Sequence, residues 1–189
     1  MRKREEEILF RGEWLSIKRA SYRSLSGAAV NWEVVERSRG ETVILLLARL
    51  RPSGRVLLLR QFRAGINRTV IALPAGVVGP GGDPRLQAEA ELREETGYTG
   101  RIVGESPPLK INPAILDCDV RVYRMEIDEE ARENQNPRQA LEPEEEIEVL
   151  PVRPEEMEEF LLREKKAGRE VDVACWLWAM GKWAVGSGE

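Results

Sequence analysis

The chain has 189 residues, of which 42% are hydrophobic, and a net charge of -4 at pH 7, which fits one packed domain, alone or with an appended segment. The negative charge argues against a nucleic-acid-binding surface, and no apolar run approaches the roughly 20 residues of a membrane-spanning helix. The absence of histidine excludes His-ligated zinc, a Ser-His-Asp triad and a Cys-His dyad, so any acid–base catalysis must use carboxylates, Lys, Tyr, Cys or metal-bound water.

The N-terminal sequence MRKREEEILF is charged and lacks the apolar stretch of a secretory signal. Cys118 and Cys175 are far apart in the sequence and form no CxxC motif. Isolated thiols of this kind are typical of a reducing compartment, and we therefore expect a cytoplasmic protein.

Residues 1–40 alternate between polar and apolar side chains and contain a turn at residues 24–27, which predicts a β-hairpin or a β-meander. Two tryptophans, Trp14 and Trp32, lie in this segment. They serve either to pack the hairpin or to stack on a flat base, for which the rigid indole ring is suited.

Further strands are predicted at residues 42–50, 55–64, 69–76, 100–106, 118–127 and 147–152. The polar, acidic stretch at 128–145 predicts a mobile loop, and loops of this length are usually functional or disordered. An amphipathic helix is predicted from Pro154 to about Lys166, where Gly168 stops it, and a tryptophan-rich helix follows at 171–185.

The best-defined helix is predicted between Asp83 and Gly97. Asp83 is a good N-cap, Pro84 suits the first helical position, and Gly97 suits the position after the last turn. The helix follows a strand and a glycine-rich loop, so that strand, loop and capped helix form one continuous motif at residues 73–98.

Three carboxylates at helical positions i, i+3 and i+4 share one face of this helix: Glu91, Glu94 and Glu95. One interpretation is a solvated acidic face, since acidic runs are common on helices. The other is a site for a divalent cation, which would relieve the repulsion between these side chains. Oxygen ligands of this type favour Mg²⁺ or Mn²⁺.

The motif LPAGVVGPGGDPRLQAEAELREETGY resembles the Nudix box, G-x5-E-x7-R-E-U-x-E-E-x-G-U, in which U is a bulky apolar residue. The matching positions are Gly76, Glu91, Leu92, Glu94, Glu95, Gly97 and Tyr98. Gly82 stands in place of the first Glu of the box, and Ala90 in place of its Arg. In the superfamily these two box residues commonly pair, so their joint loss removes an interaction without orphaning a charge.

The similarity covers most of the chain: GEWLSIKRASY, VNWEVVERS, RQFR and INPAILD resemble segments of the ADP-ribose and ADP-sugar pyrophosphatase branch. The resemblance implies an α+β fold, the Nudix α/β/α sandwich with a mixed sheet, preceded by the N-terminal β-meander. It implies a segment at residues 1–40 for dimerisation and base binding and a Nudix hydrolase domain at residues 41–189. A homodimer with swapped N-terminal strands is implied as well.

The activity implied is metal-dependent hydrolysis of the pyrophosphate bond in ADP-ribose or a related nucleoside diphosphate sugar, giving AMP and a sugar phosphate. Mg²⁺ or Mn²⁺ would be held by Glu91, Glu95 and the backbone carbonyl of Ala75. Glu94 would contribute to the metal site and to catalysis.

The resemblance places the base that activates water in the loop LEPEEEIEV, where Glu145 is the first choice and Glu142 and Glu144 are alternates. The residues that would bind the substrate are Trp14, Trp32, Glu33, Arg37, Arg63 and Asn112. The tryptophans would sandwich the base, with Trp14 from the same chain or from its partner. The acidic residue would accept from the adenine amino group, the arginines would hold the pyrophosphate or terminal ribose, and the asparagine would contact the terminal sugar.

Three functions stay open from the sequence: an active ADP-sugar pyrophosphatase, a Nudix hydrolase of another nucleotide, and a non-catalytic ADP-ribose-binding module. The altered box at Gly82 and Ala90 motivates the last. Retention of all three helix carboxylates argues against it, because binding alone does not need them.

Overall fold

The structure is a computed structural model that describes residues 1–37 and 41–185, with side chains described up to Gly181. The chain divides into two compact units. The first consists of Met1–Ile44, Val77–Pro84 and Ser106–Arg121, and the second of Leu45–Gly76, Arg85–Glu105 and Val122–Glu189. The predicted boundary between residues 40 and 41 falls beside residues 38–40, which lie outside the described residues, so it stays a prediction.

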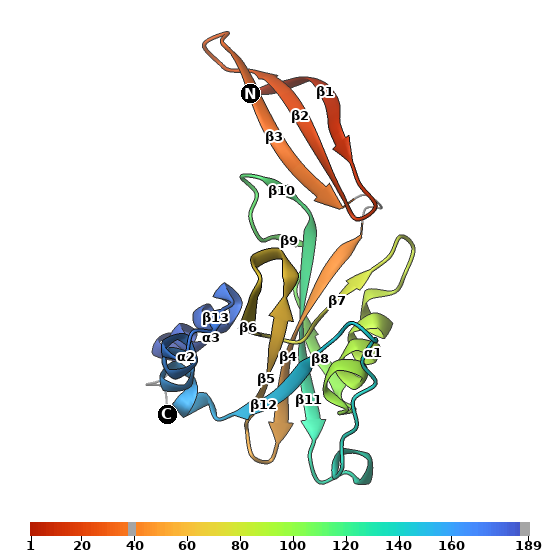
Figure 1. The fold of residues 1–189 in the computed structure, drawn as a ribbon, viewed down its shortest axis with the longest axis vertical. Helices are drawn as coiled ribbons and strands as arrows, with labels where there is room; N and C mark the ends of the chain where they lie inside the picture. The colour runs from red at the N-terminus through yellow and green to blue at the C-terminus, as the bar shows by residue number, and fades with distance from the viewer. Residues whose placement is uncertain (38–40, 186–189) are drawn as a thin grey trace. The chain divides into compact units, whose positions relative to one another are not determined.

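The first unit is built on an antiparallel meander of β1 (Arg2–Arg11), β2 (Leu15–Arg23) and β3 (Ala29–Arg37), coloured red to orange in Figure 1. The turn between β2 and β3 is closed by Ser24, whose Oγ accepts a 3.0 Å hydrogen bond from the Ala28 N–H. Two short strands, β9 (Leu109–Lys110) and β10 (Leu116–Asp117), follow later, and β10 pairs in parallel with β3. The predicted N-terminal meander is confirmed.

The larger sheet has the strand order β13-β6-β5-β4-β11-β8, with β12 paired to β5, β7 paired to β4 and β9 paired to β11. Besides β9, its strands are β4 (Thr42–Arg51), β5 (Val56–Arg63), β6 (Arg68–Ala72), β7 (Ala75–Val78), β8 (Arg101–Glu105), β11 (Asp119–Asp128), β12 (Ile147–Val152) and β13 (Glu170–Val171). Strand β13 runs parallel to β6, whereas β5 is antiparallel to both β6 and β12. The sheet is therefore mixed, as predicted.

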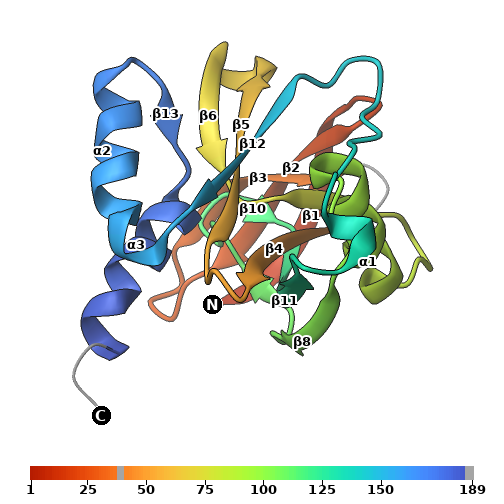
Figure 2. The ribbon, with the colours of Figure 1, turned by 90° about the horizontal axis from the view of Figure 1, so that it is seen from below.

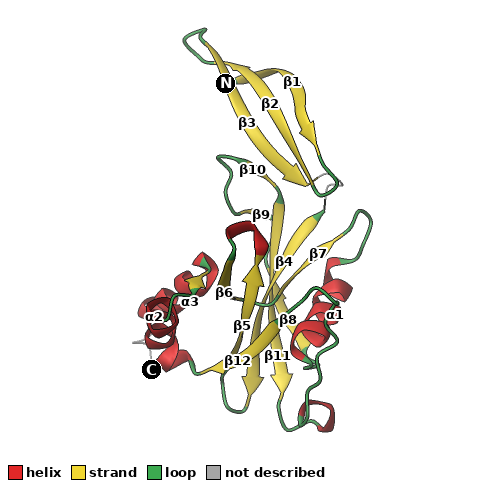
Figure 3. Ribbon diagram, viewed as in Figure 1, coloured by secondary structure: helices red, strands yellow, loops and turns green. Residues whose placement is uncertain are grey.

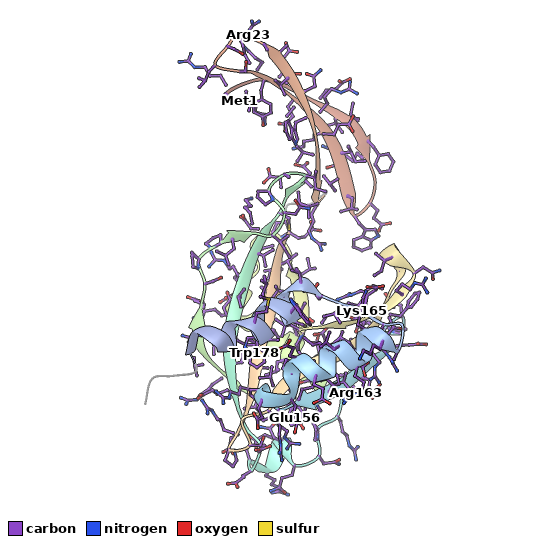
Figure 4. The ribbon with its side chains drawn as sticks, turned by 90° about the vertical axis from the view of Figure 1, so that its left-hand side faces the viewer. Met1, Arg23, Glu156, Arg163, Lys165 and Trp178 are labelled. Carbon is purple, nitrogen blue, oxygen red and sulfur yellow. The ribbon has the colours of Figure 1, made fainter. Side chains whose placement is uncertain are left out.

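Helix α1 (Pro84–Thr96) lies on one side of this sheet, and α2 (Met157–Lys166) and α3 (Val173–Val185) lie on the other, as Figure 2 shows. Figure 3 shows how few helices accompany the strands, and Figure 4 shows α2 and α3 side by side, with Arg163 on α2 and Trp178 on α3. The predicted α/β/α sandwich is confirmed.

Alternation along β5 directs its side chains to the two faces of the sheet. Val56 and Leu58 join a buried cluster with Met157 and Leu161 of α2, which marks the α2–α3 face. Gln61 belongs to the alternate set of positions, and its side chain therefore faces the α1 side.

The acidic loop at residues 128–145, predicted to be mobile, is held at several points. Asn134 is buried, accepts a 2.8 Å hydrogen bond from the Thr99 N–H and donates to the carbonyls of Thr99 and Asp128. Thr99 lies 35 residues away in sequence, so the polar composition of the loop gave no sign of these attachments.

Candidate active site

Helix α1 begins at Pro84, directly after Asp83, and ends at Thr96, where the predicted caps place its ends. Gly97 has a φ of 77°, and its N–H donates a 2.9 Å hydrogen bond to the Arg93 carbonyl. An L side chain is strained at this φ, which explains why glycine ends the helix. The ends of α1 set which residues are helical, and therefore which face of the helix its carboxylates share.

Glu95 is the buried carboxylate of α1, with 3% of its surface exposed. Its Oε2 accepts a 2.9 Å hydrogen bond from the Ala75 N–H at the start of β7. Burial raises the pKa of Glu95 to about 8; the Ala75 hydrogen bond opposes this rise, Glu91 and Glu145 add to it, and Arg63 opposes it. An ionised Glu95 therefore calls for a compensating positive charge.

Glu91 lies against Gly76 of β7. A Cβ atom built on Gly76 would come within 2.0 Å of Glu91 Oε1, so glycine creates the space that this carboxylate occupies. Gln87, one turn earlier on α1, donates a 3.0 Å hydrogen bond from Nε2 to the same Oε1. The glycine that opens the sequence motif thus has a structural reason.

Glu145 is the loop carboxylate whose charge acts on Glu95. Its Oε2 accepts a 3.1 Å hydrogen bond from the Glu142 N–H. Gln139 ties the same loop to α1 and β12, because its Nε2 donates to the carbonyls of Glu95, at 2.6 Å, and Ile147, at 3.1 Å. The alternate bases, Glu142 and Glu144, have exposed side chains.

The carboxylate and carbonyl oxygens on α1, β7 and the loop are ligands of the type that hard divalent cations prefer. Glu94 is half-buried, and its backbone carbonyl accepts a 2.9 Å hydrogen bond from the Ala140 N–H. Across residues 1–37 and 41–185, no three Asp, Glu or Cys side chains stand close enough together to hold an ion as placed. The negative charges of Glu91 and Glu145, which both act on the buried Glu95 carboxylate, nevertheless fit a site where a cation would compensate them.

Arg63, at the end of β5, lines two cavities of the second unit. The larger, of about 820 Å³, also includes Ala75 and Asp172 in its lining. The smaller, of about 380 Å³, is bounded by the loop glutamates and by Gln61. Arg63 thus offers a positive charge beside both spaces and beside Glu95.

The predicted base-binding tryptophans belong to the first unit and do not come together within one chain. Leu15, next to Trp14, pairs with Arg37, whereas Ala20 pairs with Trp32. Five residues along an antiparallel pair span about 17 Å. Trp32 Nε1 donates a 2.7 Å hydrogen bond to the Ala114 carbonyl, and its side chain lines a cavity of about 270 Å³.

The other predicted substrate contacts of the first unit are Glu33, Arg37 and Asn112. Glu33 of β3 forms a 3.8 Å ion pair with Arg19, and Arg37 is the half-buried last residue of β3. Asn112 is exposed, and its backbone carbonyl closes the turn that leads into β10 by accepting from the Leu116 N–H at 2.8 Å. Their roles toward a substrate stay predictions.

The two departures from the motif are accommodated locally. The Gly82 N–H donates a 3.0 Å hydrogen bond to the Gly79 carbonyl, and a Cβ at Gly82 would lie 3.0 Å from the Val78 side chain. A larger residue would require this turn to shift. Ala90 is half-buried on α1 and supplies no charge beside Glu94.

Two residues of the site region, Gln61 and Gln139, were not found from the sequence. Both are glutamines without motif spacing, and their positions become informative only through contacts with distant strands and α1.

The comparisons with known proteins define the class. The NUDIX domain family matches residues 39–177, which is most of the chain. An uncharacterized Nudix hydrolase of Schizosaccharomyces pombe is 32% identical over 175 residues, covering 89% of this chain and 85% of the relative. The chain therefore belongs to the NUDIX domain family, and the prediction of a Nudix-type hydrolase is confirmed.

Two further similarities are more specific. An ADP-ribose pyrophosphatase of Saccharomyces cerevisiae is 29% identical over 169 residues, covering 85% of this chain and 73% of the relative. A crystal structure of an ADP compounds hydrolase superposes with a TM-score of 0.68 over 99% of this chain and 95% of that one, at 16% identity, which supports the fold. Within the described residues, no helix has both the length and the apolar character that a membrane span requires.

Proposed function

We propose that this chain hydrolyses the pyrophosphate bond of ADP-ribose or a related nucleoside diphosphate sugar with Mg²⁺ or Mn²⁺, giving AMP and a sugar phosphate. The observation that carries the proposal is the buried Glu95 carboxylate, on which the charges of Glu91 and Glu145 act, in a family of hydrolases. These carboxylates would suit a divalent cation, which would supply positive charge beside the pyrophosphate. The substrate class is supported by the similarity to a yeast ADP-ribose pyrophosphatase.

In this proposal Glu91, Glu95 and the Ala75 carbonyl hold the cation, with Glu94 contributing. When bound, the cation neutralises charge on the two phosphates. Arg63 binds a phosphate or the terminal ribose through its planar guanidinium. Glu145 accepts a proton from the attacking water; the action of its charge on Glu95 supports this assignment over Glu142 and Glu144, whose side chains are exposed.

The first unit binds the nucleoside. Trp14 and Trp32 stack on the base, Glu33 accepts from the adenine amino group, and Arg37 and Asn112 complete the substrate contacts. Because the two tryptophans of one chain are separated along the β2–β3 pair, the sandwich uses Trp14 from a partner chain in a homodimer with swapped N-terminal strands.

The test is a panel of ADP-ribose, other nucleotide sugars and dinucleotides, assayed with Mg²⁺, with Mn²⁺ and with chelator, for the wild type and Glu95→Gln. We expect AMP from ADP-ribose only with a divalent cation, and a loss of at least about 100-fold in the variant. Turnover of a different nucleotide alone would favour the shifted-substrate function. Ligand-induced stabilisation without hydrolysis would favour the non-catalytic module, for which the altered residues Gly82 and Ala90 argue.

A further inference from the structure

Gln61 Oε1 is the single buried side-chain nitrogen or oxygen atom without a hydrogen-bond partner among the described residues. Gln61 is only 6% exposed and pairs with Ile147, the first residue of β12. A buried amide oxygen without a donor is costly, and such atoms in folded proteins usually meet a water or a ligand. Gln61 therefore points to a donor that the chain itself does not supply.

The location of Gln61 limits what that donor is. Its neighbour Arg60 faces α2, where its Nη2 binds Glu164 at 2.9 Å, so Gln61 faces the opposite side of the sheet together with Arg63. Gln61, Arg63 and Glu145 line the same cavity of about 380 Å³. This polar space is large enough for several waters. Gln61, the residue that carries the orphaned oxygen, thus lines the same cavity as the proposed base.

The proposed hydrolysis supplies a donor with the required chemistry. An attacking water has two protons, and its oxygen reaches phosphorus in a defined direction only if both protons are held. Glu145 accepts the proton that is transferred. The second proton stays on the water oxygen. Because this proton is held and not transferred, a neutral hydrogen-bond acceptor is sufficient for it.

We propose that Gln61 Oε1 and the Glu145 carboxylate hold one water between them, and that this water is the nucleophile of the reaction. The assignment of the water as nucleophile rests on the proposed function. The water oxygen forms the new bond to phosphorus, and one water proton passes to Glu145. The bridging P–O bond breaks, and its electron pair leaves with the departing phosphate. The proton held by Gln61 remains on the product phosphate, which makes Gln61 a positioning residue.

The first arm of the test is a crystal structure of the wild type with Mg²⁺, with and without an ADP-ribose analogue whose bridging oxygen is a methylene group. We expect an ordered water within hydrogen-bond distance of both Gln61 Oε1 and Glu145. This arm does not depend on turnover. If the wild type hydrolyses no nucleotide sugar, the proposed function fails, whereas a water on both side chains still supports the water site and its absence overturns it.

The second arm measures kcat and KM of Gln61→Leu, which removes the acceptor. We expect kcat to fall on the order of 10- to 100-fold while KM changes less than about threefold. Gln61→Glu keeps an acceptor oxygen, so its kcat should exceed that of Gln61→Leu.

The matched control is Leu59→Met, a volume-conserving change at a buried position on the same face of β5. It should keep kcat within about threefold of the wild type. Wild-type kinetics in Gln61→Leu, or an equal loss of kcat in Leu59→Met, would overturn the positioning role.

Discussion

Glu95 couples the stability of the chain to the charge that its site carries. Its pKa is raised from 4.5 to about 8 in the fold, so the native state binds this proton more tightly than the unfolded chain does. The contribution of this proton to the free energy of unfolding is full below about pH 4.5 and is lost as the pH rises through about 8. The free energy of unfolding of the cation-free protein should accordingly fall as the pH rises across this interval.

Glu95→Gln should remove most of this pH dependence, because the amide keeps an acceptor for the Ala75 N–H but does not ionise. Urea unfolding in the presence of a chelator, at about pH 5 and at about pH 9, measures the pH dependence of the unfolding free energy. Between these values, the wild type should lose on the order of 2–4 kcal/mol more than the variant. Parallel pH dependence in the two proteins would show that Glu95 is not the group responsible.

Gly76→Ala should weaken cation binding without unfolding the protein. The new Cβ would overlap the Glu91 side chain, which must rotate away from β7. We expect a rise of about 10-fold or more in the Mn²⁺ concentration for half-maximal activity. The matched control is Gly79→Ala, where a Cβ has no neighbour within 4 Å and metal dependence should stay unchanged.

At the scale of elements, the C-terminal end of α1 depends on Gly97 for two reasons. Its φ of 77° disfavours any side chain, and an added Cβ would lie 2.4 Å from the Arg138 backbone nitrogen. Gly168, which follows α2, has a φ of 85° but no atom within 4 Å of its Cβ position. Gly97→Ala should therefore destabilise the fold by at least about 1 kcal/mol more than Gly168→Ala in urea unfolding.

The loop that carries Glu145 should depend on Gln139. Gln139→Ala removes the donor shared by the carbonyls of Glu95 and Ile147, and we expect a loss of about 1–2 kcal/mol in unfolding free energy. The kcat should fall as well, because the loop loses its tie to α1. Gln135→Ala is the control in the same loop, since its side chain makes a single exposed hydrogen bond. Equal effects of the two changes would contradict this role.

The elements that the sequence predicts well are those with local signals. Helix α1 is bounded by a cap, a proline and a glycine, and β11 is indicated by the alternation of its polar and apolar residues. Strand β13 was missed because two residues, Glu170 and Val171, have no periodicity and are recruited by pairing with β6. The attachments of the acidic loop were missed because Asn134 and Gln139 find their partners across the fold.

The residues of the candidate site likewise divide into those that local sequence signals predict and those that only the folded structure reveals. The α1 carboxylates and Gly76 could be read from their spacing, because a helix converts spacing into a shared face. Gln61 could not, since an orphaned acceptor exists only after β12 and the cavity are in place. The separation of Trp14 from Trp32 follows from the register of β2 and β3, which a pattern of alternation does not give.

At the scale of the whole molecule, the proposed swapped dimer has a direct test. Trp14→Ala and Trp32→Ala should each impair hydrolysis. If each site takes Trp14 from one chain and Trp32 from the other, a heterodimer of the two variants contains one intact site. Refolding the two variants together in equal amounts should restore roughly a quarter of the wild-type sites.

Each variant refolded alone serves as the control and should remain impaired. No recovery in the mixture, with heterodimers shown by mass spectrometry of intact complexes, would mean that both tryptophans act within one chain or not at all.

The hydrogen bond from Trp32 to the Ala114 carbonyl fixes one edge of the indole ring, while 46% of the residue remains exposed. Trp176 and Trp178, by contrast, pack against the α2–α3 cluster. A nucleotide stacked on Trp32 should therefore quench part of the ultraviolet emission of the protein. That optical change would report occupancy of the base site even in a variant that has lost all turnover.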